Sequence, residues 1–261
     1  MKKLKVLSIV LVLVMALAVV ADASSLVAPV TAKAYQGFAM VPAFRVGPGK
    51  DANGVQVYTM TTVMANAIFD ADGRVVNVIF DSLEVSTPNY DGASMPHFSG
   101  WPATPGYNVS SHEGDNSKVT GVSTNTNETI AAEVTGWKTK RERGDAYGMN
   151  ATNDWHKQAD FYQNFFVGKT VAELEQWAAK NTSDLNGRPL RVPAETTKPE
   201  DKAKYEKLTA AEKAVLADVV SGATMSLKDA HGDFIATLKK AYANRVEIKV
   251  PIQVEYSVNM Q

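Results

Sequence analysis

Residues 62–80, TVMANAIFDADGRVVNVIF, decide the fold class of this chain. Apolar side chains recur at every second position on both sides of the centre, which is typical of strands with one face in a protein core. Between the two runs, Asp72-Gly73 is a strong hairpin signal, because both central positions of a type I′ turn need a positive φ. We therefore expect residues 62–69 and 74–85 to form an antiparallel hairpin.

The rest of the chain places strands before helices and one strand after them. Residues 35–87 favour strands, and residues 246–256 alternate apolar and polar side chains, with Pro251 on the polar face, which indicates a sheet edge. Capping boxes at residues 170–173 and 209–212 begin two helices separated by a linker at 182–205, and a third helix is expected after Ser226. This order predicts an α+β domain whose antiparallel sheet has helices packed on one face.

Residues 88–150 interrupt this regular pattern. They contain four prolines, many Gly, Ser, Asn and Thr residues and scattered aromatic residues. We expect a long irregular insertion with short strands around residues 130–137. Insertions of this length are often functional, and aromatic side chains are able to stack on a bound ring, but we expect these to hold the insertion onto the domain.

The amino terminus has the pattern of a secretory signal. A basic start is followed by an apolar run at residues 6–20 and by small residues up to Ser24, so we expect a signal peptide at 1–23, cleaved after Ala23. An uncleaved anchor is the alternative, but the run is shorter than the roughly 20 residues that a spanning helix needs. We therefore expect a protein located outside the cytoplasm.

Composition excludes several classes of function. Loss of residues 1–23, which hold three Lys and one Asp, changes the net charge from −1 to −3, and an acidic chain without a basic block is not expected to bind nucleic acid. The absence of Cys excludes disulfides, iron–sulfur clusters, thiolate zinc sites and c-type haem attachment. The four His residues show no spacing typical of metal ligands. A redox role would therefore depend on a cofactor held without sulfur.

One run of small and hydroxylated residues points to a site. This run is Asp218-Val219-Val220-Ser221-Gly222-Ala223-Thr224-Met225-Ser226. Gly222 is expected as a left-handed helix C-cap and Ser226 as the next N-cap, which would set the Thr224 hydroxyl beside a helix N-terminus suited to phosphate. An ordinary corner between helices explains Gly222 and Ser226, but it leaves Asp218, Ser221, Ala223 and Thr224 unexplained.

The run resembles the flavin-attachment motif of the FMN-binding domain family, Asp-x-x-Ser/Thr-Gly-Ala-Thr-x-Ser/Thr, and the likeness extends over about half of the mature chain. The resemblance implies a single FMN-binding domain at residues 24–261, with FMN joined to Thr224 by a phosphoester. Its cofactor-binding residues would be Asp218, Ser221, Gly222, Ala223, Thr224 and Ser226. Asp218 would orient the motif or bind the metal of the transferase during attachment, or else be a solvated helix residue.

The same resemblance implies partners and a role. A separate, Mg-dependent FMN transferase would attach the flavin outside the cytoplasm at the expense of FAD. The protein would then relay electrons between a membrane donor and an extracytoplasmic acceptor. Two other functions stay open: a secreted binding module that uses the insertion at 88–150, and a flavin reductase with its own substrate.

Overall fold

The computed structural model describes residues 30–52, 54–90, 95–103, 112–113, 118–119, 124–228 and 232–252. The predicted signal peptide lies outside these residues. The chain divides into two compact units, residues 1–34 with 247–261 and residues 35–246. In the smaller unit, Lys33 pairs with Glu247 at 3.1 Å. The larger unit holds the helices and most of the sheet, and it contains the motif.

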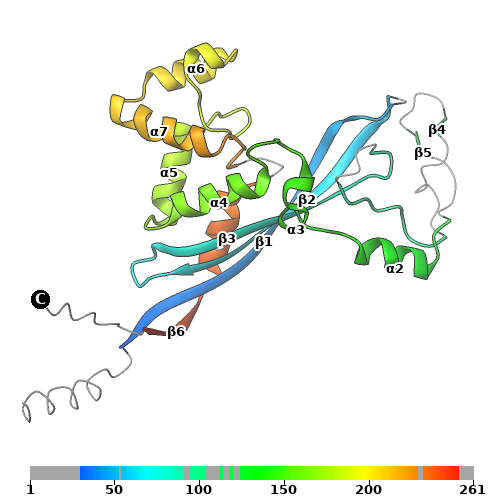
Figure 1. The fold of residues 1–261 in the computed structure, drawn as a ribbon, viewed down its shortest axis with the longest axis horizontal. Coiled ribbons are helices and arrows are strands. Elements are labelled where there is room, and N and C mark those ends of the chain that lie inside the picture. The colour runs from blue at the N-terminus through cyan, green and yellow to red at the C-terminus, as the bar shows by residue number, and fades with distance from the viewer. Residues whose placement is uncertain are drawn as a thin grey trace, which may run out of the picture. The chain divides into compact units, whose positions relative to one another are not determined.

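The main sheet has four strands in the order β3-β2-β1-β6 (Figure 1). Its strands are β1 (Val30–Lys50), β2 (Gln56–Phe69), β3 (Val75–Ser86) and β6 (Val246–Ile252). β2 is antiparallel to both β1 and β3, so the predicted hairpin is confirmed. β6 lies at an edge of the sheet, as Pro251 predicted, and the remainder of the predicted closing strand lies outside the described residues.

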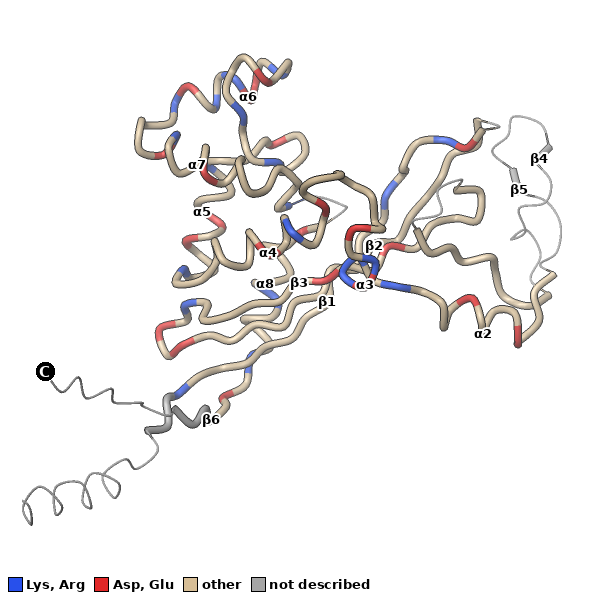
Figure 2. Tube along the Cα trace, viewed as in Figure 1, with Lys and Arg blue, Asp and Glu red and all other residues tan. Residues whose placement is uncertain are grey.

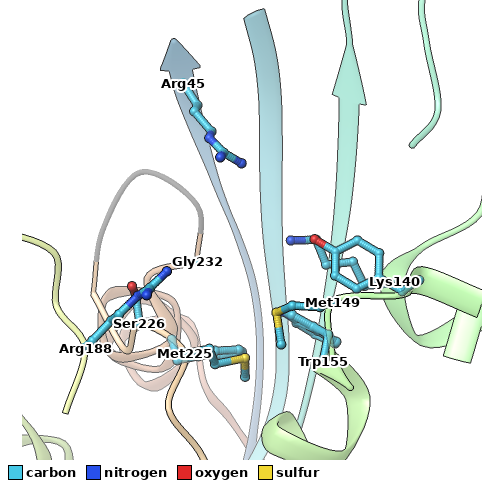
Figure 3. Close-up of a pocket in the computed structure, with 10 residues that line it drawn as sticks. Arg45, Lys140, Met149, Trp155, Arg188, Met225, Ser226 and Gly232 are labelled. Carbon is cyan, nitrogen blue, oxygen red and sulfur yellow. The ribbon is translucent and has the colours of Figure 1, made fainter. Parts of the chain in front are cut away.

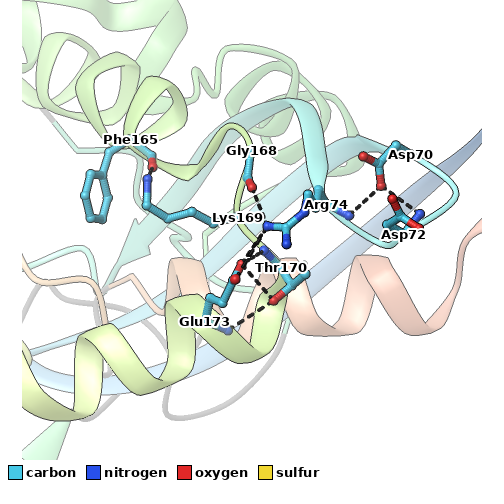
Figure 4. Close-up of polar contacts among 8 residues, drawn as sticks. All are labelled: Asp70, Asp72, Arg74, Phe165, Gly168, Lys169, Thr170 and Glu173. Atoms are coloured by element: carbon cyan, nitrogen blue, oxygen red, sulfur yellow. Dashed lines mark hydrogen bonds and ion pairs between the residues drawn. The ribbon is translucent and has the colours of Figure 1, made fainter.

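The turn of this hairpin differs from the predicted type I′. Only Gly73 has a positive φ, 78°, and the register shifts where Phe69 pairs with Val75. Asp70 explains the difference, because its carboxylate accepts hydrogen bonds from the backbone N–H groups of Asp72 (2.9 Å) and Arg74 (2.8 Å) (Figure 4). A side chain that caps the turn in this way favours a longer loop ending in a left-handed glycine.

The helices cover one face of the sheet. α4 (Trp155–Phe166) packs on β3, and α8 (Phe234–Ala243) packs on β2. α5 (Val171–Asn181) lies against α8, and α7 (Ala210–Gly222) lies against α4. The core joins Phe80 of β3 to Phe234 of α8, with ring centroids 4.6 Å apart and an interplanar angle of 71°, a favourable edge-to-face contact. The predicted α+β class, with helices on one face of an antiparallel sheet, is confirmed.

The opposite face of the sheet carries exposed apolar side chains at alternating positions. They are Phe38, Met40, Phe44, Val46, Tyr58, Met60 and Ile79. Apolar residues therefore lie on both faces of β1 and β2. Alternation along these strands does not divide the side chains into one apolar and one polar face.

One prediction about the loops is wrong, and two other loop segments contain short helices. Residues 130–137 were expected to contain strands but belong largely to α2 (Asn127–Thr135), which begins with a reciprocal cap between Thr126 and Thr129. The linker at 182–205 contains the short helix η2 (Pro193–Glu195) and the start of α6 (Pro199–Glu206). The insertion at 88–150 also contains α3 (Lys140–Arg143), which is mostly basic (Figure 2), and the 3-10 helix η1 (Gly144–Tyr147).

Three aromatic residues of the insertion, Phe98, Trp101 and Trp137, pack on one another next to β3. Phe98 and Trp101 have ring centroids 4.8 Å apart, and the indole of Trp137 donates to the His97 carbonyl at 2.9 Å. Ser86 of β3 binds the same segment, accepting a backbone hydrogen bond from Phe98 at 3.1 Å. Two further short strands, β4 (His112–Glu113) and β5 (Lys118–Val119), pair with each other.

Within the part of the chain that the structure describes, no helix has the length and apolar character needed to cross a membrane. The same residues contain no group of three or more His, Asp or Glu side chains placed to hold a metal ion.

Candidate functional site

The motif lies where α7 ends. α7 begins at Ala210, capped by Thr209 and Glu212 as predicted, and it continues through Gly222. The next helix, α8, starts only at Phe234, with Asp233 as its N-cap. Ser226 is therefore not an N-cap; its hydroxyl donates to the Asn186 carbonyl at 2.7 Å. The phosphate site predicted at a helix N-terminus beside Thr224 is not formed.

Gly222 is also not a left-handed cap. It lies in the last turn of α7 and lacks a positive φ, and the cap residue is Ala223, with an extended backbone. Glycine is needed for another reason: a Cβ at this position would lie 2.1 Å from the Phe161 ring. The small residue lets α7 approach α4 at the start of the motif loop, which we define as residues 223–227.

Replacing Gly222 by alanine is expected to destabilise the protein by about 1–3 kcal/mol, because the Phe161 ring must move to admit the methyl group. Urea denaturation measures the change. Gly136→Ala is the matched control, because a Cβ at this helix end meets its nearest atoms at an ordinary 3.4 Å. Equal stability of the two variants would contradict the packing role of Gly222.

Side chains from α4 and the residue before its cap hold the motif loop in place. The buried Gln158 accepts hydrogen bonds from the backbone N–H groups of Thr224 (2.8 Å) and Met225 (2.9 Å). Asn153 donates to the Gly222 carbonyl at 2.9 Å, and Tyr162 donates its hydroxyl proton to the Met225 carbonyl at 2.7 Å. Burial raises the pKa of Tyr162, so its phenol stays protonated and remains a donor.

The six predicted site residues have different environments. Asp218 and Ser221 are exposed on α7, and the Ser221 hydroxyl donates to the Asp218 carbonyl at 2.7 Å. Ala223 is fully buried in the core. Thr224 is half-buried, and no residue that the structure describes hydrogen-bonds to its hydroxyl. The structure thus singles out Thr224 as the motif residue whose hydroxyl is available.

A cavity of about 210 Å³ lies directly beside the motif loop (Figure 3). Met225 and Ser226 form part of its wall. Figure 3 shows Arg45, Arg188, Met149 and Met225 arranged around one common space, although they come from separate parts of the chain. The remaining lining residues are Lys140, Tyr147, Trp155, Gly232 and Phe234.

A buried carboxylate organises two of the cations in this wall. Glu84, 1% exposed, accepts from Arg45 Nη1 and Lys140 Nζ, each at 3.1 Å. Burial by itself would raise the pKa of Glu84, but attraction to Lys140 and Arg45 outweighs burial and holds this pKa below its usual value. Arg188 is exposed and makes no ion pair with any described residue. With three lining cations and one carboxylate, the net charge of the cavity wall is positive.

The residues at this site fit a phosphate-linked flavin in three respects. The Thr224 hydroxyl is available, its backbone is fixed by Gln158, and the neighbouring wall offers cations and aromatic rings. They do not supply the helix N-terminus expected from the sequence. Arg45 and Lys140 already bind Glu84, so Arg188 is the lining cation that has no ion pair with a described residue.

Sequence patterns missed most of the residues that build this site. The helix that carries Gln158 and Tyr162 has a detectable signal, because Trp155, Ala159, Tyr162 and Phe166 are spaced by four, three and four residues. No local pattern connects Arg45, Lys140 and Arg188, since they lie on elements far apart in the chain.

The fold and site describe an α+β domain with a cationic, aromatic cavity beside an available threonine. No family model matches the chain. The chain is similar to a chlorophenol reductase of Desulfitobacterium hafniense, with 37% identity over 231 residues. The match covers 85% of this chain and 62% of the relative, so the chain spans less than two thirds of that protein's length. No solved structure matches.

Proposed function

We propose that the protein is an exported flavoprotein that carries FMN on Thr224 and relays electrons from a membrane donor to an extracytoplasmic acceptor. In the attachment step, the Thr224 oxygen forms a bond to the FMN phosphorus. The phosphoanhydride bond of FAD breaks, AMP leaves, and the hydroxyl proton passes to solvent. The bound flavin supplies the redox chemistry, while the protein fixes its position and surroundings.

The observation that carries this proposal is the contrast between the two polar groups of Thr224. Its backbone N–H is held by Gln158 at 2.8 Å, whereas its hydroxyl has no partner among the described residues. A fixed backbone with an available hydroxyl suits a modification site, because an enzyme can reach the oxygen without breaking a native hydrogen bond. Similarity to a protein named as a reductase supports a redox role.

The test is the mass of the intact protein after co-expression with an FMN transferase. The wild-type protein is expected to gain the mass of FMN less one water, and Thr224→Ala is expected to gain nothing. Thr224→Ser, which keeps a hydroxyl, is the matched control and is expected to retain the adduct. An adduct that survives Thr224→Ala, or that peptide mapping places on Ser221 or Ser226, would contradict the proposal.

The similarity favours a second candidate function, a reductase with its own small-molecule substrate. A chlorinated phenol is the first substrate to assay, because the relative's name states that it reduces a chlorophenol. Turnover with reduced viologen as donor would identify the protein as an enzyme, and reduction of the flavin without turnover would favour the carrier. A colourless protein that loses a binding activity when residues 88–150 are removed would instead support a binding module.

A further inference from the structure

We propose that the cavity beside the motif loop binds a single aromatic ring that carries a negatively charged oxygen. The ligand would thereby lie next to the flavin attachment residue, so its part in electron transfer rests on the proposed function. Binding itself depends only on the size, charge and lining of the cavity.

The volume of the cavity selects a small ring. A cavity of about 150 Å³ is large enough to hold benzene, whereas sites for larger organic ligands span about 300–1,000 Å³. At about 210 Å³, this cavity has room for one substituted benzene ring. The three fused rings of a flavin need more space, so a flavin tethered at Thr224 would leave the cavity free for another molecule.

The charges around the cavity favour an anion. Arg45, Lys140 and Arg188 are lining cations. Arg143 stacks behind the lining residue Tyr147, 4.6 Å from the ring centroid, and its guanidinium nitrogens are buried without a hydrogen-bond partner among the described residues. Against these four cations stand two buried carboxylates. They are Glu84, bound to Arg45 and Lys140, and Asp154, which accepts from three backbone N–H groups.

The apolar part of the wall suits an aromatic body. Trp155 and Phe234 are 5% and 1% exposed, and their ring centroids lie 6.0 Å apart. Met149 and Met225 add polarizable thioethers, which make favourable contacts with aromatic rings. A wall that combines buried rings with an arginine that has no ion pair with a described residue matches a ligand with an apolar ring and one charged oxygen.

The experiment uses 4-nitrophenol, which changes colour on ionisation near neutral pH. The full chain is titrated by calorimetry both with and without attached FMN, and the FMN-free protein is titrated by absorbance. Wild-type protein is expected to bind the phenolate more tightly than nitrobenzene, a neutral ring of similar size, and to lower the pH at which the bound dye ionises. Because a hydrogen bond to a charged group is strong, Arg188→Met is expected to weaken phenolate binding about tenfold.

Arg191→Met is the matched control, since Arg191 is exposed on the same loop but does not line the cavity. It is expected to leave phenolate binding unchanged. Equal affinity for nitrophenolate and nitrobenzene, or equal effects of the two arginine substitutions, would overturn the proposal. Phenolate binding to a protein that never gains FMN would support this site while removing the proposed function. Attachment of FMN without phenolate binding would support the proposed function and overturn the phenolate site.

Discussion

Glu84→Ala is expected to lower the free energy of unfolding by about 3–5 kcal/mol, because it leaves a buried lysine and a partly buried arginine without their counter-ion. Lys140 is the more costly of the two, since its side chain is only 4% exposed, against 22% for Arg45. A small domain has about 5–15 kcal/mol of stability in total, so this substitution removes a large share. Urea denaturation at neutral pH measures the loss.

The double variant Glu84→Met with Lys140→Met is the control, because it removes both buried charges. It is expected to be more stable than Glu84→Ala, since replacing a buried ion pair by apolar residues often costs little. If the single and double variants were equally unstable, the loss would come from packing or from the unpaired Arg45, and not from the buried charge of Lys140.

The same carboxylate predicts a pH dependence of stability. Its pKa is lowered in the folded protein, so its stabilisation is complete above the unfolded pKa of about 4.3 and is lost as the pH falls through the folded value. Stability of the wild-type protein is therefore expected to fall below about pH 4 more steeply than that of Glu84→Gln. Identical slopes for the two proteins would show that Glu84 does not titrate with unfolding.

Gln158→Leu is expected to lower the free energy of unfolding by about 2–4 kcal/mol and to slow the attachment of FMN. It removes the acceptor of the Thr224 and Met225 N–H groups and the donor to the Asn153 carbonyl, and each such bond contributes roughly 1 kcal/mol, more where a buried group is left unpaired. The Thr224 hydroxyl itself is untouched. Slower attachment of FMN would therefore show that the motif loop is no longer held in the position that the reaction needs.

Gln163→Leu separates this effect from general destabilisation. Gln163 lies on the same helix and also accepts a backbone N–H, from Phe80 at 2.9 Å, but its hydrogen bonds with described residues do not involve the motif loop. It is expected to lower stability while leaving the rate of FMN attachment unchanged, as followed by intact mass over time. Equal slowing of attachment in both variants would show that overall stability, and not the Gln158 contact, controls the reaction.

Periodicity predicted the strands and the helices with strong caps. The runs around Val63 and Val78 alternate, and Thr209 with Glu212 begins α7, because local hydrogen bonds and one buried face act over few residues. α2 was mistaken for strands, since Ile130 and Val134 are β-branched, whereas the cap at Thr126 and the alanines between them favour a helix.

The attachment residue could be proposed from a local motif, but its surroundings could not be derived from the sequence. Ser226 is a good N-cap by residue type, yet the apolar stripe of the next helix starts at Phe234, and Asp233 caps it. The positive cavity depends on Arg45, Lys140 and Arg188, which tertiary packing alone brings together. The number of charged residues and their spacing in the sequence do not show which distant elements the fold brings together.

Hydrogen bonds hold the motif loop from two sides, and they limit how far the attachment point of a chromophore could move. On one side are the α4 contacts, and on the other Leu227 donates its N–H to the Gly187 carbonyl at 3.0 Å while Ser226 binds Asn186. Gly187 has a φ of 65°, and a Cβ there would lie 1.7 Å from the Lys228 carbonyl oxygen, so the two segments touch closely. The polarisation of light emitted by a flavin on Thr224 would therefore decay through rotation about the bonds of its own ribityl–phosphate linker and through tumbling of the domain, with no contribution from motion of the loop.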